Sequence, residues 1–109
     1  MTTGGASDML SHMVYFTLNE YTPAAAEQLV AACHTYLKDH PGVVFFAAGT
    51  LVEDLARPVN DLDFHVSLHV VFDSREAHDA YQVHEQHLAF IEQNKATWKQ
   101  VRVFDSMVS

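Results

Sequence analysis

The stretch Leu10-Ser-His-Met-Val-Tyr-Phe-Thr-Leu18 alternates between two sets of side chains, which is the period of a β-strand. One set consists of His12, Val14, Phe16 and Leu18, and the other consists of Met13, Tyr15 and Thr17. Both sets include large apolar side chains. A sheet built on this strand therefore needs a cover on each of its two faces.

The sequence after this strand alternates between helical and extended patterns. Thr22-Pro23 supplies an N-cap and a first-turn proline for a helix that ends at Pro41-Gly42. A second helix begins after the cap Ser74 and can break near His84. Further strands are expected at residues 43–52, 64–72 and 99–105. The order β-α-β-β-α-β predicts an α+β, ferredoxin-like fold, in which a four-stranded antiparallel sheet carries both helices on one face.

The second face of this sheet bears on the oligomeric state. Met13 and Tyr15 belong to it, and the strand at residues 43–52 is apolar on both sides. A chain of this length has no further element to cover that face. We therefore expect a homodimer that packs sheet against sheet as a dimeric α/β barrel. The alternative is a monomer with a loose loop over its sheet.

Composition limits the partners and the compartment. The chain has 109 residues with 14 acidic and 6 basic side chains, and the basic ones are scattered. Nucleic acid and anionic membranes are therefore not expected as partners. Residues 1–8 lack the basic start and the apolar run of a signal peptide. We expect a disordered N-terminal tail at residues 1–8, a single domain at residues 9–109, and a cytoplasmic location.

Several polar side chains are candidates for one pocket between the sheet and the helices. His12 and Asp105 fall on the inner faces of their strands, while Tyr81, His84 and His87 are spaced three apart on the second helix. In an apolar pocket these groups can satisfy one another as a structural network. They can equally act as base, acid and orienter around a bound molecule. Spacing alone leaves both interpretations open.

The remaining histidines and the aromatic residues complete the set of expectations. We expect His34, His40 and His78 to be solvated, and His65 and His69 to point toward the partner subunit. Phe16, Phe90 and Trp98 suit stacking on an aromatic ligand, and they also suit plain core packing. His84-x-x-His87 is an i, i+3 pair, but its spacing demands no metal ion, and we expect none.

The segment Tyr81-Gln-Val-His-Glu-Gln-His-Leu-Ala-Phe90 resembles the stress-responsive dimeric α/β-barrel (Dabb) family, which carries a tyrosine and then His-Pro-x-His. The resemblance extends along nearly the whole chain. His12 is similar to an early histidine of the family, Pro41-Gly42-Val43 to its helix-ending segment, and Val103-Phe104-Asp105 to its closing strand. Glu85 stands where the family usually has proline, so a softer bend between the two histidines is expected.

The resemblance implies a dimeric ferredoxin-like barrel, and it leaves the activity open. Most members have no established activity, and some plant members are associated with stress tolerance. This implies a small stress-responsive protein of unassigned activity with a histidine-lined ligand pocket.

A plant polyketide cyclase of the family closes a ring by aldol condensation. By the motif match its roles would fall on His87 and Tyr81, with His12 lining the pocket. The corresponding hypothesis is a cofactor-free acid/base enzyme, in which His87, oriented by Asp105, deprotonates a small aromatic or polyketide-like ligand. Tyr81 would donate to the developing oxyanion, with His12 as a further donor. A cofactor-free monooxygenase of the related barrel superfamily is a third hypothesis, which rests on analogy of fold.

Overall fold

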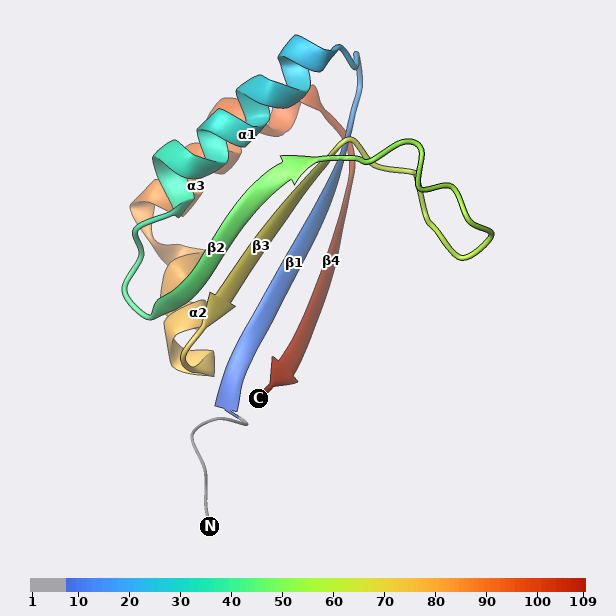
Figure 1. Ribbon diagram of the computed structural model, residues 1–109. Helices are drawn as coiled ribbons and strands as arrows, with labels where there is room; N and C mark the ends of the chain where they lie inside the picture. Colours follow the sequence, from blue (N-terminus) through green and yellow to red (C-terminus); the bar gives the residue numbers. More distant parts are fainter. Residues whose placement is uncertain (1–7) are drawn as a thin grey trace.

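The computed structural model describes residues 8–109, so the expected tail lies outside the described residues except for Asp8. Four strands form one antiparallel sheet in the order β2-β3-β1-β4. The strands are β1 (Met9–Leu18), β2 (Val43–Thr50), β3 (Val66–Phe72) and β4 (Trp98–Val108), and the helices are α1 (Pro23–Leu37), α2 (Arg75–Val83) and α3 (Glu85–Asn94), with a 3₁₀ turn at Lys95–Thr97. The helices lie together on one side of the sheet (Figure 1), which confirms the predicted ferredoxin-like architecture.

The helices begin where the sequence places capping residues. Thr22 and Ser74 each accept a hydrogen bond from the backbone N–H three residues later. The second helix divides in two at His84, where the backbone is extended (φ −67°, ψ 142°) and the imidazole Nδ1 accepts from Gln86 N as the cap of α3. The break thus falls at the residue where the sequence allowed one. No helix in the described range is long and apolar enough to cross a membrane.

The core fills the space between the sheet and the helices. Its buried members from the sheet are Leu10, Val14, Phe16, Leu18, Val66, Leu68, Val70 and Phe72, and those from the helices are Ala26, Leu29, Cys33, Leu37, Tyr81 and Phe90. Cys33 has no exposed surface, and burial raises the pKa of its thiol to about 12. The alanines beside Cys33 in the sequence predict a small buried side chain rather than a nucleophile, and the structure agrees with this.

The start of β3 differs from the predicted alternation. The strand begins at Val66, and Phe64 lies on the open face of the sheet, 5.0 Å from the Tyr15 ring. Alternation along residues 64–72 would place Phe64 on the helix side with Val66 and Leu68, and this is wrong. The prediction that His65 points toward the partner subunit is wrong as well. The pairing of β1 with β4 shifts at Leu18, and His65 Nδ1 supplies an acceptor for Leu18 N at 2.9 Å. The imidazole also stacks on the exposed Tyr21 ring at 4.3 Å.

The loop between β2 and β3 does not lie over the sheet. It extends beyond the end at which β2 finishes and β3 begins (Figure 1). Arg102 on β4 holds it there through the Asp61 carboxylate, at 2.8 Å, and through the Asp63 carbonyl oxygen, at 3.1 Å. Asp61 and Phe64 of this loop line one end of the open face, and the loop leaves the other apolar side chains of that face uncovered.

Gly42 makes the turn from α1 into β2. Its backbone φ is +87°, and residues other than glycine adopt this angle only at a cost in free energy. A Cβ at this position would lie 2.5 Å from Ala77 Cβ, and the carbonyl oxygen of Gly42 accepts from Asp73 N at 2.8 Å. The turn can therefore neither take a side chain nor move away from α2 without losing a contact.

Gly42→Ala is expected to lower the free energy of unfolding by roughly 2–4 kcal/mol, from the positive φ and the clash together. Urea unfolding followed by circular dichroism measures this. Gly49→Ala is the matched control, because nothing lies within 4 Å of a Cβ there. It should cause no loss, and a loss as large as that of Gly42→Ala would contradict the explanation.

Candidate functional site

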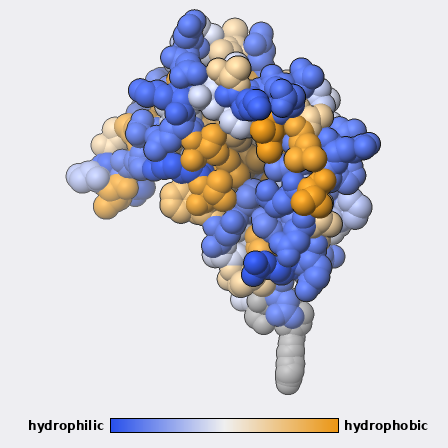
Figure 2. Space-filling model, turned by 180° about the vertical axis from the view of Figure 1, so that it is seen from behind, coloured by the Kyte–Doolittle hydropathy of each residue, from blue (hydrophilic) through white to orange (hydrophobic). Residues whose placement is uncertain are grey.

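A cavity of about 180 Å³ lies between the sheet and the helices. Its apolar wall consists of Val14, Phe16, Leu37, Leu68, Phe90, Ile91, Trp98, Val101 and Val103, and its polar members are His12, Tyr81, Gln82 and His87. Val101 and Val103 on edge strand β4 are 40% and 49% exposed, so the cavity opens beside that strand. Seen from behind, the molecule presents hydrophobic surface around a hollow (Figure 2). The expected pocket residues His12, Tyr81, His87, Phe16, Phe90 and Trp98 therefore share one cavity.

The shortest polar contact at this site among the described residues joins His12 and Asp105. They lie directly opposite each other on β1 and β4, and His12 Nδ1–H donates to Asp105 Oδ1 at 2.5 Å. The imidazole is buried, whereas the carboxylate side chain is 45% exposed. We expected Asp105 to orient His87, but the register of the two strands places it on His12 instead. The bond fixes the His12 ring and leaves its Nε2 as the proton acceptor.

Three residues that line the cavity each hold a buried polar atom without a hydrogen-bond partner among the described residues. These atoms are Tyr81 Oη, His87 Nδ1 and Trp98 Nε1. The Tyr81 and His87 rings are 4.7 Å apart. A buried polar atom without a partner costs about 1–3 kcal/mol, so three around one cavity are unusual. Tyr81 Oη and Trp98 Nε1 are donors, and His87 Nδ1 can donate or accept, so the wall of the cavity holds three polar groups whose hydrogen bonds are not made within the described residues.

Burial sets the protonation of these groups. It lowers the pKa of His12 despite the raising effect of the Asp105 hydrogen bond, and it lowers that of His87, with a further decrease from the charge of His12. Burial also raises the pKa of the Tyr81 phenol. Near neutral pH the cavity therefore presents two neutral imidazoles and a protonated phenol.

Three other histidines have surroundings that differ from those predicted from the sequence. His84 lies outside the cavity, because it is exposed and caps α3. His40 is buried and donates from Nε2 to the Tyr36 carbonyl oxygen at 3.1 Å, and its ring meets the Tyr81 ring edge-on at 4.9 Å. His78 is mostly buried and its ring lies 5.2 Å from the His12 ring. The prediction that His40 and His78 are solvated is wrong, whereas His34 is exposed as expected.

Sequence reasoning missed His78, although a signal was present. His78 precedes Tyr81 by three positions, so the two side chains share a face of α2. The neighbouring Asp79 and Gln82 suggested a solvated side of the helix. In the structure both contact His78, at 3.0 Å from its Nδ1 and 3.4 Å from its Nε2.

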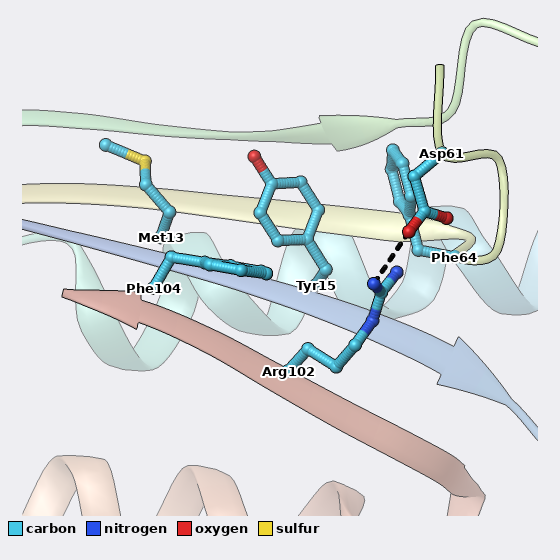
Figure 3. A pocket seen from close by; sticks show the side chains of 6 residues that line it. All are labelled: Met13, Tyr15, Asp61, Phe64, Arg102 and Phe104. Atoms are coloured by element: carbon cyan, nitrogen blue, oxygen red, sulfur yellow. Dashed lines mark hydrogen bonds and ion pairs between the residues drawn. The ribbon is translucent and has the colours of Figure 1, made fainter. Parts of the chain in front are cut away.

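A second and larger cavity, of about 420 Å³, lies on the open face of the sheet. It is lined by Met13, Tyr15, Asp61, Phe64, Arg102 and Phe104, and Figure 3 shows these side chains in a row with the Arg102–Asp61 ion pair at one end. The Tyr15 ring meets the rings of Phe64 and Phe104 edge-on, at 5.0 and 5.7 Å. His69 is on the same face, 6.2 Å from the Tyr15 ring.

Residues 10–108 match the family described as the stress responsive A/B barrel domain, Dabb. The chain belongs to this family. The match includes both strands of the His12–Asp105 pair and the break at His84. No curated protein matches this Dabb chain.

Solved structures share the fold at low sequence identity. A Dabb family protein from Mesorhizobium loti is 20% identical with a TM-score of 0.76, covering 94% of this chain and 98% of its own. A dimeric ferredoxin-like protein of unknown function from Thermobifida fusca is 17% identical with a TM-score of 0.77, covering 94% and 92%. Hydroxynitrile lyase from Passiflora edulis is 16% identical with a TM-score of 0.74, covering 94% and 95%. At such identities the likeness establishes the fold alone.

Tyr81→Phe is expected to raise the free energy of unfolding of the ligand-free protein by about 1 kcal/mol, because it removes a buried hydroxyl that lacks a partner. The melting temperature should rise by roughly 4 °C, measured by differential scanning calorimetry. Tyr21→Phe, at an exposed tyrosine, serves as the control and should change the free energy by less than about 0.5 kcal/mol. A lower melting temperature for Tyr81→Phe would show that the hydroxyl has a partner.

Proposed function

We propose that this Dabb protein catalyses proton transfer on a small carbonyl compound, using the cavity between sheet and helices. The observation that carries the proposal is the His12–Asp105 bond of 2.5 Å at the wall of a cavity whose other polar atoms lack partners. An imidazole held by a carboxylate is the arrangement of a general base with its orienting group.

The base in this proposal is His12. With Nδ1–H given to Asp105, Nε2 takes a proton from the carbon next to the carbonyl group, and the electron pair of that C–H bond moves to the carbonyl oxygen as an enolate forms. The imidazolium that results is stabilised by the Asp105 carboxylate beside it. The imidazolium exchanges its proton with solvent or keeps it, and then returns a proton to carbon or oxygen when the product forms, so no external acid is consumed.

The enolate oxygen needs hydrogen-bond donors, and two residues of the cavity wall carry them. Tyr81 Oη and Trp98 Nε1 are both buried and have no partner among the described residues. A hydrogen bond from such a donor to a negatively charged oxygen is stronger than one to a neutral oxygen, so these donors would stabilise the enolate more than the ketone. His87 lies beside Tyr81 and offers its free Nδ1 to a hydroxyl group or a second polar group of the substrate.

The size of the cavity selects among substrates. About 180 Å³ corresponds to roughly six water molecules of liquid, at about 30 Å³ each. This is below the roughly 300–1,000 Å³ of pockets for drug-sized ligands. A one-ring or short-chain carbonyl compound fits this volume, and a long polyketide chain does not. Hydroxynitrile lyase from Passiflora edulis provides an example of an enzyme built on this fold.

The test uses cyclohexanone as a one-ring probe in D₂O, with exchange of its α-protons followed by NMR. The protein should accelerate exchange over buffer. His12→Gln should lose about 100-fold or more of that acceleration, and Tyr81→Phe about tenfold or more. His34→Gln, at an exposed histidine of α1, is the matched control and should behave like the unmodified chain.

Two outcomes would contradict the proposal. One is exchange at the buffer rate while the ketone still binds, which would make the chain a binding protein. The other is equal loss of activity in His12→Gln and His34→Gln, which would point to general instability instead of a base. Circular dichroism of each variant separates loss of chemistry from loss of fold.

We also propose that the open face is the interface of a homodimer. Phe45 and Phe104 on this face are 55% and 54% exposed, and Met13 and Tyr15 lie between them on β1 and line the larger cavity. Exposed aromatic side chains clustered on one face are typical of interfaces. The similar structure from Thermobifida fusca is described as dimeric.

Phe104→Asp is expected to convert the dimer into a monomer, because it buries a carboxylate twice across a two-fold interface. Light scattering coupled to gel filtration gives the mass directly. Val59→Asp is the control, since Val59 is 84% exposed on the loop between β2 and β3, away from the proposed contact. A monomeric mass for the unmodified chain would refute the interface.

A further inference from the structure

His12, His78 and Asp105 converge from three elements of the fold. His12 and Asp105 are paired across β1 and β4, and His78 comes from α2 above them. Their possible ligand atoms all lie within 4.8 Å of one another. Of these three, His78 has no part in the proton-transfer proposal. The cluster therefore raises a question separate from that proposal, although it shares two residues with it.

The surroundings of His78 are those of a metal ligand. Its Nδ1–H donates to Asp79 Oδ1 at 3.0 Å, and its Nε2 receives the Gln82 side-chain amide at 3.4 Å. The lone pair of Nε2 is thus engaged by the Gln82 amide, which must move away when Nε2 binds an ion. Histidines that bind metals usually give their other ring N–H to a carboxylate, which holds the ring in place.

The cluster is also accessible from solvent. A hollow of about 270 Å³ beside it is lined by Leu10, Arg75, His78, Asp105, Ser106 and Met107. Asp105 is 45% exposed on this side, whereas His12 is buried beneath it. The one cationic side chain at the hollow is Arg75, whose Nε lies 3.6 Å from Asp79. The Asp79 carboxylate, which also accepts from His78, offsets this charge beside the cluster.

The ligand types indicate which ions suit the site. Two imidazoles and one carboxylate suit Zn²⁺ and neighbouring divalent transition metals, which bind such sets with water in the open position. Ca²⁺ and Mg²⁺ prefer oxygen ligands, of which the cluster has a single carboxylate. With metal–ligand distances of about 2.0–2.1 Å, ligand atoms around tetrahedral Zn²⁺ stand roughly 3.3 Å apart. His78 must then approach the pair by at most about 1.5 Å, and His12 Nδ1 and Asp105 Oδ1 must separate from 2.5 Å to roughly 3.3 Å.

We propose that His12, His78 and Asp105 bind one divalent transition-metal ion per chain, with Zn²⁺ as the representative ion and water completing its coordination. The ion takes the place of the proton between His12 Nδ1 and Asp105 Oδ1. The proton then resides on Nε2, so the metal-bound chain lacks the free base that the proton-transfer proposal requires. Metal binding and proton transfer on a carbonyl compound are thus mutually exclusive states of one pair of residues.

The test is isothermal titration calorimetry of the chelator-treated full chain with ZnCl₂. One Zn²⁺ per chain is expected to bind, and His78→Gln should weaken that binding at least about tenfold. Asp105→Asn, which keeps the side-chain shape, should weaken it to a similar degree. His34→Gln removes an exposed histidine and is the matched control, with affinity equal to that of the unmodified chain.

A second measurement identifies the ligands. Co²⁺ in place of Zn²⁺ should give visible absorption bands of a low-coordinate histidine site, and these bands should be lost in His78→Gln. Equal affinities of His78→Gln and His34→Gln, or absence of one-to-one binding, would overturn the proposal. Calorimetry registers binding without turnover, so failure of the proton-transfer proposal would leave this result intact, and failure of metal binding would leave ketone exchange measurable.

Discussion

Strand β1 is hydrogen-bonded on both edges, to β3 and to β4, and this double pairing sets the surroundings of most residues at the candidate site. Side chains on a strand alternate strictly between the two faces of a sheet. His12 therefore lies under α2 with Asp105 beside it, while Met13 and Tyr15 belong to the open face. A register slip of one residue would exchange the two sets and remove both the pair and the cavity.

The side chains around the cavity include buried polar groups that lower the stability of the folded protein. Tyr81, His87 and Trp98 each bury a polar atom that has no partner in the described part of the chain. Each such atom costs about 1–3 kcal/mol of stability. The cost of all three is a large fraction of the free energy of unfolding of a typical domain, about 5–15 kcal/mol. Apolar side chains of similar shape would avoid this cost. This cost is the reason for proposing that a polar molecule occupies the cavity.

The break between α2 and α3 decides which side chains meet at the cavity. Because α2 ends at Val83 and α3 begins at Glu85, His84 turns outward and caps the N-terminus of α3. His87 then lies 4.7 Å from the Tyr81 ring. One turn earlier, α2 brings His78 against His12. A change of backbone direction at a single residue thus separates an outer histidine from two inner ones, even though all three occur in one short stretch of sequence.

The sequence by itself determined the order of strands and helices, the caps at Thr22 and Ser74, the two apolar faces of β1 and the inner positions of His12, Tyr81 and His87. These features follow from periodicity and capping preferences, which act between residues close in the chain. Only the tertiary structure decided that Asp105 pairs with His12 instead of His87, that His84 leaves the cavity, and that His78 joins His12 and Asp105. Strand register and the direction of α3 relative to α2 decide these contacts, and both depend on packing between residues that are far apart in the sequence.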